Sequence, residues 1–88
     1  EIEKQYNMPF YLDKNIKNVL PLNKNAKILD LGCGFGRYLK SIQELGYTDI
    51  QGVEIGDEQN KFLKNKGFNI TQQDIFEFLK NTKDKYDF

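Results

Sequence analysis

The stretch KILDLGCGFGRYL, residues 27 to 39, decides the fold of this 88-residue chain. Its first five residues form a short apolar run, interrupted by Asp30, that is typical of a buried strand. Glycines follow at positions 32, 34 and 36, and apolar residues then recur at helical spacing from Tyr38 to Leu45. In a unit of strand, glycine-rich loop and helix, the loop lets a ligand approach the main chain, and the first helical N–H groups face that ligand. The stretch therefore predicts a ligand-binding loop in an α/β fold.

The alternation of strand and helix continues along the chain. Apolar runs between turn residues predict strands over 49–55 and 68–72, with a helix over 57–66 that Asp57 caps. Asp74 caps a further helix, with Glu77 three residues later, and residues 86–88 begin a fourth strand. A leading helix over 10–20 stops at Pro21. This order predicts a parallel sheet with right-handed crossovers.

Composition excludes several classes of function. Thirteen basic and thirteen acidic side chains cancel, so the chain has no overall positive charge that would attract nucleic acid. Cys33 is the single cysteine and histidine is absent, so we expect no metal site. No apolar run reaches the roughly 20 residues of a membrane span, and the first residues lack a signal-peptide core, which favours a cytoplasmic location.

The glycine spacing distinguishes two classes of cofactor. The dinucleotide fingerprint G-x-G-x-x-G would require glycine at position 37 or 39, where Arg37 and Leu39 stand. The sequence instead has Asp-x-Gly-x-Gly-x-Gly from Asp30 to Gly36, which resembles motif I of the class I S-adenosylmethionine-dependent methyltransferases. A carboxylate at the mouth of the loop suits the ammonium and sulfonium of S-adenosylmethionine better than a pyrophosphate.

The resemblance implies roles for residues after the first two strands. Asp30 would bind the methionine ammonium, and the main chain at Gly32, Cys33 and Gly34 would contact the methionine and ribose. Glu54, at the end of the second strand, would accept both ribose hydroxyls, as the corresponding acid does in dinucleotide folds. Taken alone, Glu54 would be an ordinary solvated acid.

The adenine end would involve three further residues. By resemblance, Ile55 would lie against the adenine, Asp74 would receive its amino group, and Ile75 would pack on the ring and offer its N–H. Asp74 is equally suited to capping the helix that follows it, so the sequence leaves both roles open.

Other candidates are weaker. Cys33 stands where the loop needs a small residue, and no histidine is present to activate it as a nucleophile. Tyr6, Phe10 and Tyr11 would close over the cofactor, accept part of the substrate, or pack a helix on the sheet.

The resemblance extends to the whole fold and to the reaction. It implies a Rossmann-like, doubly wound parallel sheet, with three strands and the start of a fourth belonging to a seven-stranded domain. Residues 1–25 would form a leading helix and turn, and residues 26–88 the N-terminal part of the S-adenosylmethionine-binding domain. The chain would thus be a fragment whose catalytic residues follow Phe88, so we name none.

The predicted function is methyl transfer to a small-molecule, glycan or lipid-intermediate acceptor. Nucleic acid is disfavoured because no basic patch interleaved with aromatic residues is present. An NAD(P)-dependent oxidoreductase is one alternative, and a non-catalytic S-adenosylmethionine-binding scaffold is the other. The sequence does not decide the oligomeric state or the acceptor atom.

Overall fold

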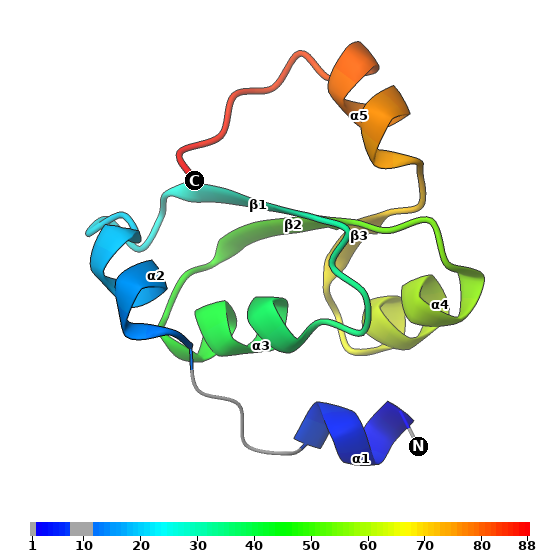
Figure 1. Ribbon diagram of the computed structural model, residues 1–88, viewed down its shortest axis with the longest axis horizontal. Helices are drawn as coiled ribbons and strands as arrows, with labels where there is room; N and C mark the ends of the chain where they lie inside the picture. The colour runs from blue at the N-terminus through cyan, green and yellow to red at the C-terminus, as the bar shows by residue number, and fades with distance from the viewer. Residues whose placement is uncertain (1, 8–11) are drawn as a thin grey trace.

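A computed structural model describes residues 2–7 and 12–88. Its centre is a three-stranded parallel sheet of β1 (Lys27–Leu31), β2 (Asp49–Val53) and β3 (Asn69–Thr71), in the order β1-β2-β3 (Figure 1). The register pairs Leu31 of β1 with Val53 of β2, and Val53 with Thr71 of β3. All three strands therefore end at one edge of the sheet.

Helices cover both faces of this sheet. α3 (Arg37–Glu44) and α4 (Asp57–Asn65) lie on one face, and α5 (Ile75–Asn81) lies on the other (Figure 1). The chain moves outward from β1 to β3 and then returns across the opposite face, which confirms the predicted doubly wound α/β fold. The reversal makes the carboxyl edge of β1 a topological switch point, where such sheets bind ligands.

The last residues return to the free side of β1, where the fourth strand was expected. The Asp87 N–H donates to the Lys27 carbonyl at 2.7 Å, and the Leu29 N–H donates to the Phe88 carbonyl at 2.9 Å. Residues 86–88 have no regular strand geometry. Their main chain is nevertheless joined to β1 at the predicted position.

The N-terminal region contains α1 (Ile2–Asn7) and α2 (Lys14–Val19). α2 is the predicted leading helix, but it begins later than expected because the Asp13 carboxylate caps it by accepting the Asn15 N–H at 2.7 Å. Positions 10 and 11 of the prediction lie outside the described residues. The sequence did not predict α1, whose apolar pair Ile2 and Tyr6 spans a single helical turn.

Three predicted boundaries were wrong. The second strand ends at Val53 rather than 55, because Glu54 turns its carboxylate back onto main-chain N–H groups. The third strand covers only 69–71. α4 is capped by Gly56 without a side-chain hydrogen bond, so Asp57 is its first helical residue and not its cap.

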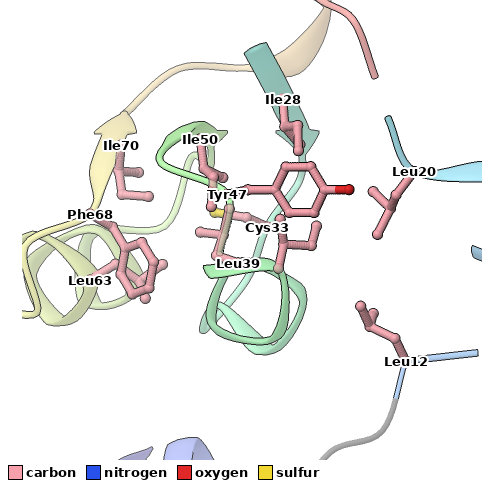
Figure 2. Packing of buried hydrophobic residues seen from close by; sticks show 11 residues of the cluster. Leu12, Leu20, Ile28, Cys33, Leu39, Tyr47, Ile50, Leu63, Phe68 and Ile70 are labelled. Atoms are coloured by element: carbon pink, nitrogen blue, oxygen red, sulfur yellow. The ribbon is translucent and has the colours of Figure 1, made fainter. Parts of the chain in front are cut away.

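The main hydrophobic core lies between the sheet and the helices α3 and α4. Ile28, Leu39 and Leu63, which belong to this core, are less than 2% exposed. Figure 2 shows the surrounding cluster, in which Cys33 packs with side chains from the strands and helices. The thiol takes up space that a side chain at Gly52 would otherwise fill, since a Cβ there would lie 2.8 Å from Cys33 Sγ.

We expect Gly52→Ala to destabilise the protein. The added Cβ would also lie 2.9 Å from Ile70 Cδ1 and 3.1 Å from Leu39 Cδ1, so the core has no room for it. Overpacking of this kind costs about 1–3 kcal/mol of unfolding free energy, measurable by urea denaturation. A Cys33→Ala change should partly restore stability in the double variant. An unchanged denaturation midpoint for Gly52→Ala would contradict this account.

Candidate functional site

The candidate site lies at the carboxyl ends of β1 and β2, where the glycine loop joins β1 to α3. Gly34 has a φ of +57°, which side chains rarely adopt. Gly36 lies against α4, where a Cβ would come within 2.5 Å of Leu63 Cδ2. By contrast, a Cβ at Gly32 or Gly34 would meet no atom within 4 Å. The loop is packed on its inner side and open on its outer side.

β2 anchors the loop through hydrogen bonds. The Gly32 and Cys33 N–H groups both donate to the Val53 carbonyl, at 2.7 and 3.2 Å. The Gly36 N–H donates to the Cys33 carbonyl at 3.0 Å, which closes the turn before α3. These bonds therefore fix the position of the loop relative to the carboxyl end of β2.

The Glu54 carboxylate joins the loop to the next turn. Its Oε1 accepts the Gly34 N–H at 2.9 Å, and its Oε2 accepts the Gly56 N–H at 2.9 Å. Each oxygen accepts only one of these bonds, although a carboxylate oxygen can accept about two. The half-buried carboxylate thus retains acceptor capacity toward the site.

Asp30 is the least compensated group at this edge. Its Oδ2 is buried and has no hydrogen-bond partner among the described residues. Burial, and then the negative charge of Glu54, raise the pKa of Asp30 from 3.8 to about 6. An uncompensated carboxylate beside a second one is the arrangement that a cationic ligand group would stabilise.

Cys33 belongs to the core rather than to the reactive surface. Burial raises the pKa of its thiol to about 12, and the charges of Asp30 and Glu54 add to this effect. The thiol is therefore protonated at neutral pH and unsuited to nucleophilic attack. Its side chain packs, while its main chain forms part of the loop.

A cavity of about 390 Å³ opens over the glycine loop. α1 supplies one wall, and its Tyr6 ring packs edge-on against Phe62 of α4, with centroids 5.2 Å apart. Lys40 Nζ donates to the Tyr6 carbonyl at 2.7 Å. Tyr6 therefore packs on α4 and lines the cavity over the loop, while its role of closing over the cofactor stays a prediction; Phe10 and Tyr11 lie outside the described residues. The lining comprises Gln5, Tyr6, Gly32, Cys33, Gly34, Phe35, Arg37 and Tyr38.

The residues assigned to the adenine end lie after β2 and β3. Ile55 directly follows Glu54 and is 65% exposed. Asp74 is the N-cap of α5, since its Oδ2 accepts the N–H groups of Phe76 at 3.0 Å and Glu77 at 3.1 Å. Ile75 is the first residue of that helix. In the described part of the chain, no hydrogen bond joins Asp74 to the glycine loop.

Two residues that the sequence reasoning missed hold these turns in place. Gln72 donates its amide N–H groups to the Ile55 carbonyl, at 3.3 Å, and to the Asp57 carboxylate, so it links the turns after β2 and β3. Asn60 of α4 is 2% exposed and donates to the Glu54 and Gly56 carbonyls. A polar residue on the apolar face of α4 was the signal that could have revealed Asn60.

Residues 2–7 and 12–88 lack the features of two other types of site. This part of the chain holds no group of three or more acidic or cysteine side chains placed to bind a metal ion. Among its helices, none combines the length and apolar character needed to cross a membrane.

Three features of the site bear on the kind of ligand that it could bind. It offers an open glycine backbone, a carboxylate with free acceptor capacity at Glu54 and a buried unpartnered oxygen at Asp30. These features fit a ligand that carries hydroxyl groups and positive charge.

Sequence comparison relates the chain to methyltransferases. The family described as "Methyltransferase domain" matches residues 5–88. Two type II methyltransferases of Haemophilus influenzae, M.HincII and M.HindII, are each 35% identical to the chain over 72 residues, which is 80% of its length. The chain spans only 14% of the length of these curated relatives.

Solved structures give the same relationship. An S-adenosylmethionine-dependent methyltransferase from Archaeoglobus fulgidus aligns with 98% of the chain, with a TM-score of 0.65 and 31% identity. The plantazolicin methyltransferase BpumL, solved in complex with S-adenosylhomocysteine, aligns with 70% of the chain, with a TM-score of 0.60 and 29% identity. The aligned regions make up 35% and 25% of those two chains.

The raised pKa of Asp30 predicts a pH-dependent contribution to stability. Between the unfolded value of 3.8 and the folded value of about 6, the native protein binds more protons at this carboxyl than the unfolded protein does. The contribution of Asp30 to the free energy of unfolding therefore falls as pH rises through this window. Relative to the unsubstituted protein, Asp30→Asn should gain on the order of 1 kcal/mol between pH 4 and pH 7, allowing for solvent screening. Urea denaturation at both pH values tests this, and an equal difference at both would contradict it.

Proposed function

The chain belongs to the family of S-adenosylmethionine-dependent methyltransferases, and from this premise we propose that it forms the cofactor-binding part of an enzyme that methylates a small-molecule, glycan or lipid-intermediate acceptor. One observation carries the proposal. The Asp30 and Glu54 carboxylates flank an open glycine loop, and Asp30 has a buried oxygen without a partner. A positively charged ligand would supply the compensation that Asp30 lacks.

The first part of the proposed site binds the methionine and ribose. Asp30 binds the ammonium group, and the main chain of Gly32, Cys33 and Gly34 lies along the methionine and ribose. Glu54 accepts the two ribose hydroxyls through the acceptor capacity that its hydrogen bonds to Gly34 and Gly56 leave. Because those two bonds fix both oxygens, the carboxylate is oriented before the ligand arrives.

The second part of the proposed site binds the adenine. The exposed side chain of Ile55 offers an apolar surface for the ring, and Ile75 offers its side chain and N–H. Both capping bonds of Asp74 go to Oδ2, so Oδ1 is the oxygen that we assign to the adenine amino group. Gln72 supports this region by joining the Ile55 carbonyl to the turn after β3.

When bound, the cofactor would supply a methyl group carried on a positively charged sulfur. As the acceptor bonds to the methyl carbon, the carbon–sulfur bond would break and the sulfur would become a neutral thioether. The described residues hold the charged end near two carboxylates and restrain the loop that surrounds it. Positioning of this kind accounts for a large part of catalysis in displacement reactions. We assign no general base within the chain, because none of the groups described here adjoins a defined acceptor site.

The negative charge beside the glycine loop favours a methyltransferase over the alternative, an NAD(P)-dependent oxidoreductase. A nicotinamide dinucleotide would place its pyrophosphate near the loop, where Asp30 and Glu54 already repel each other. The same carboxylates favour S-adenosylmethionine.

The acceptor class is supported by charge. Equal numbers of basic and acidic residues give no net attraction to a polyanion. The curated relatives are type II methyltransferases, so the assay of acceptors below includes duplex DNA as the competing class.

The cofactor assignment predicts selective binding. In calorimetric titrations of the full chain, S-adenosylhomocysteine should bind saturably and NAD should not. Glu54→Ala should weaken binding of S-adenosylhomocysteine by about tenfold or more, since hydrogen bonds to a charged group contribute about 1.5–3 kcal/mol. Glu58→Ala removes an equal charge from the exposed side of α4 and should leave the affinity unchanged. Binding of NAD alone, or of neither ligand by folded protein, would overturn the assignment.

The acceptor assignment predicts where a labelled methyl group appears. After methyl-labelled S-adenosylmethionine is incubated with the enzyme whose cofactor-binding part we propose this chain to form, the label should enter a low-molecular-mass acceptor from a metabolite and lipid extract. Unmethylated duplex DNA supplied in parallel should remain unlabelled. Label found in DNA and absent from the extract would reverse the proposed acceptor class while leaving the cofactor assignment intact.

A further inference from the structure

Asn60 is a polar residue in an apolar position. It lies on the inner face of α4, where it is only 2% exposed, one turn before the fully buried Leu63. Such a position in an amphipathic helix is ordinarily apolar, since burying an amide requires that its hydrogen bonds be replaced. The hydrogen bonds that Asn60 makes should therefore explain its presence.

Those hydrogen bonds all lead back to the turn that carries Glu54. Asn60 Nδ2 donates to the Glu54 carbonyl at 2.7 Å and to the Gly56 carbonyl at 2.8 Å. Its Oδ1 is buried and has no partner among the described residues. The side-chain amide thus donates two hydrogen bonds to one turn, while its oxygen accepts none from the described residues.

These donors complete the restraint of Glu54. The Glu54 N–H donates to the Thr71 carbonyl of β3 at 3.1 Å, so Asn60 fixes the other side of the same residue. The Gly56 N–H, on the turn that Asn60 also holds, donates to Glu54 Oε2 at 2.9 Å. Main chain and carboxylate are therefore fixed together, and Oε1 is directed to the Gly34 N–H.

We propose that Asn60 is a positioning residue for the Glu54 carboxylate: it holds the turn after β2 so that this carboxylate meets both the glycine loop and the ribose hydroxyls. The inference rests on the proposed function for its ligand, but the first half can be observed without one. Asn60 touches no ligand in this scheme and acts through Glu54.

The unliganded protein provides the first test. Amide hydrogen exchange measured by NMR in the full chain reports on the bond between the Gly34 N–H and Glu54. In Asn60→Ala, exchange at Gly34, relative to that at Ile28 in the core strand β1, should accelerate at least fivefold, approaching the rate in Glu54→Ala. Phe68→Ala, which truncates a buried side chain at the opposite end of the sheet, should leave this ratio unchanged.

Ligand selectivity provides the second test. S-adenosylhomocysteine and its 2′-deoxyribose analogue differ by one of the hydroxyls assigned to Glu54, so the ratio of their affinities measures that contact. The ratio should fall at least threefold in both Asn60→Ala and Glu54→Ala, and the double variant should lose little more than either. Phe68→Ala should lower the melting temperature and keep the ratio of the unsubstituted protein.

The outcomes distinguish this inference from the proposed function. If S-adenosylhomocysteine binds and Glu54→Ala lowers the ratio, but Asn60→Ala changes neither the ratio nor the Gly34 exchange, Asn60 is only structural and the inference is overturned. If S-adenosylhomocysteine does not bind at all, the proposed function fails, and the ribose part of the inference fails with it. Should Asn60→Ala not fold, Asn60→Ser, which keeps one donor, must show smaller changes in the same direction.

Discussion

The parallel pairing of β1 with β2 is the constraint on which the site depends. Hydrogen bonds between the two segments continue beyond the strands. The Val53 carbonyl accepts the N–H groups of Gly32 and Cys33, and the Glu54 carboxylate accepts the N–H group of Gly34. Successive residues of the glycine loop are therefore hydrogen-bonded to the end of β2 and to the residue that follows it. Any change that separates the strands moves the loop, and any strain in the loop is transmitted to the sheet.

This arrangement is electrostatically unfavourable without a ligand. Two carboxylates lie close enough that the charge of Glu54 raises the pKa of Asp30, and a buried oxygen of Asp30 has no partner. Among residues 2–7 and 12–88 no hydrogen bond accounts for that oxygen, whereas the neighbouring Cys33 and Gly52 fit each other closely. Violations of local rules that bring no structural gain tend to mark functional sites.

The sequence predicted those parts of the molecule that depend on local patterns. The strand–glycine loop–helix order and the cap at Asp74 follow from residues near one another in the chain, whereas the doubly wound topology was implied by the family resemblance. The missed features depend on tertiary contacts: Gly52 is needed because Cys33 lies over it, and Asn60 is needed because Glu54 leaves the strand early. The short α1 has too little periodicity to be recognised, and its position over the loop depends on Phe62 and Lys40.

The three acids of the candidate site, Asp30, Glu54 and Asp74, differ in the hydrogen bonds that they accept from the main chain. Glu54 and Asp74 each accept two main-chain N–H groups, so they shape turns in the unliganded protein and retain only part of their acceptor capacity. Asp30 accepts none at Oδ2. A ligand would consequently find fixed geometry at Glu54 and uncompensated charge at Asp30. Under the proposed function, the geometry of the ligand would therefore be recognised at the end of the second strand and its positive charge at the end of the first.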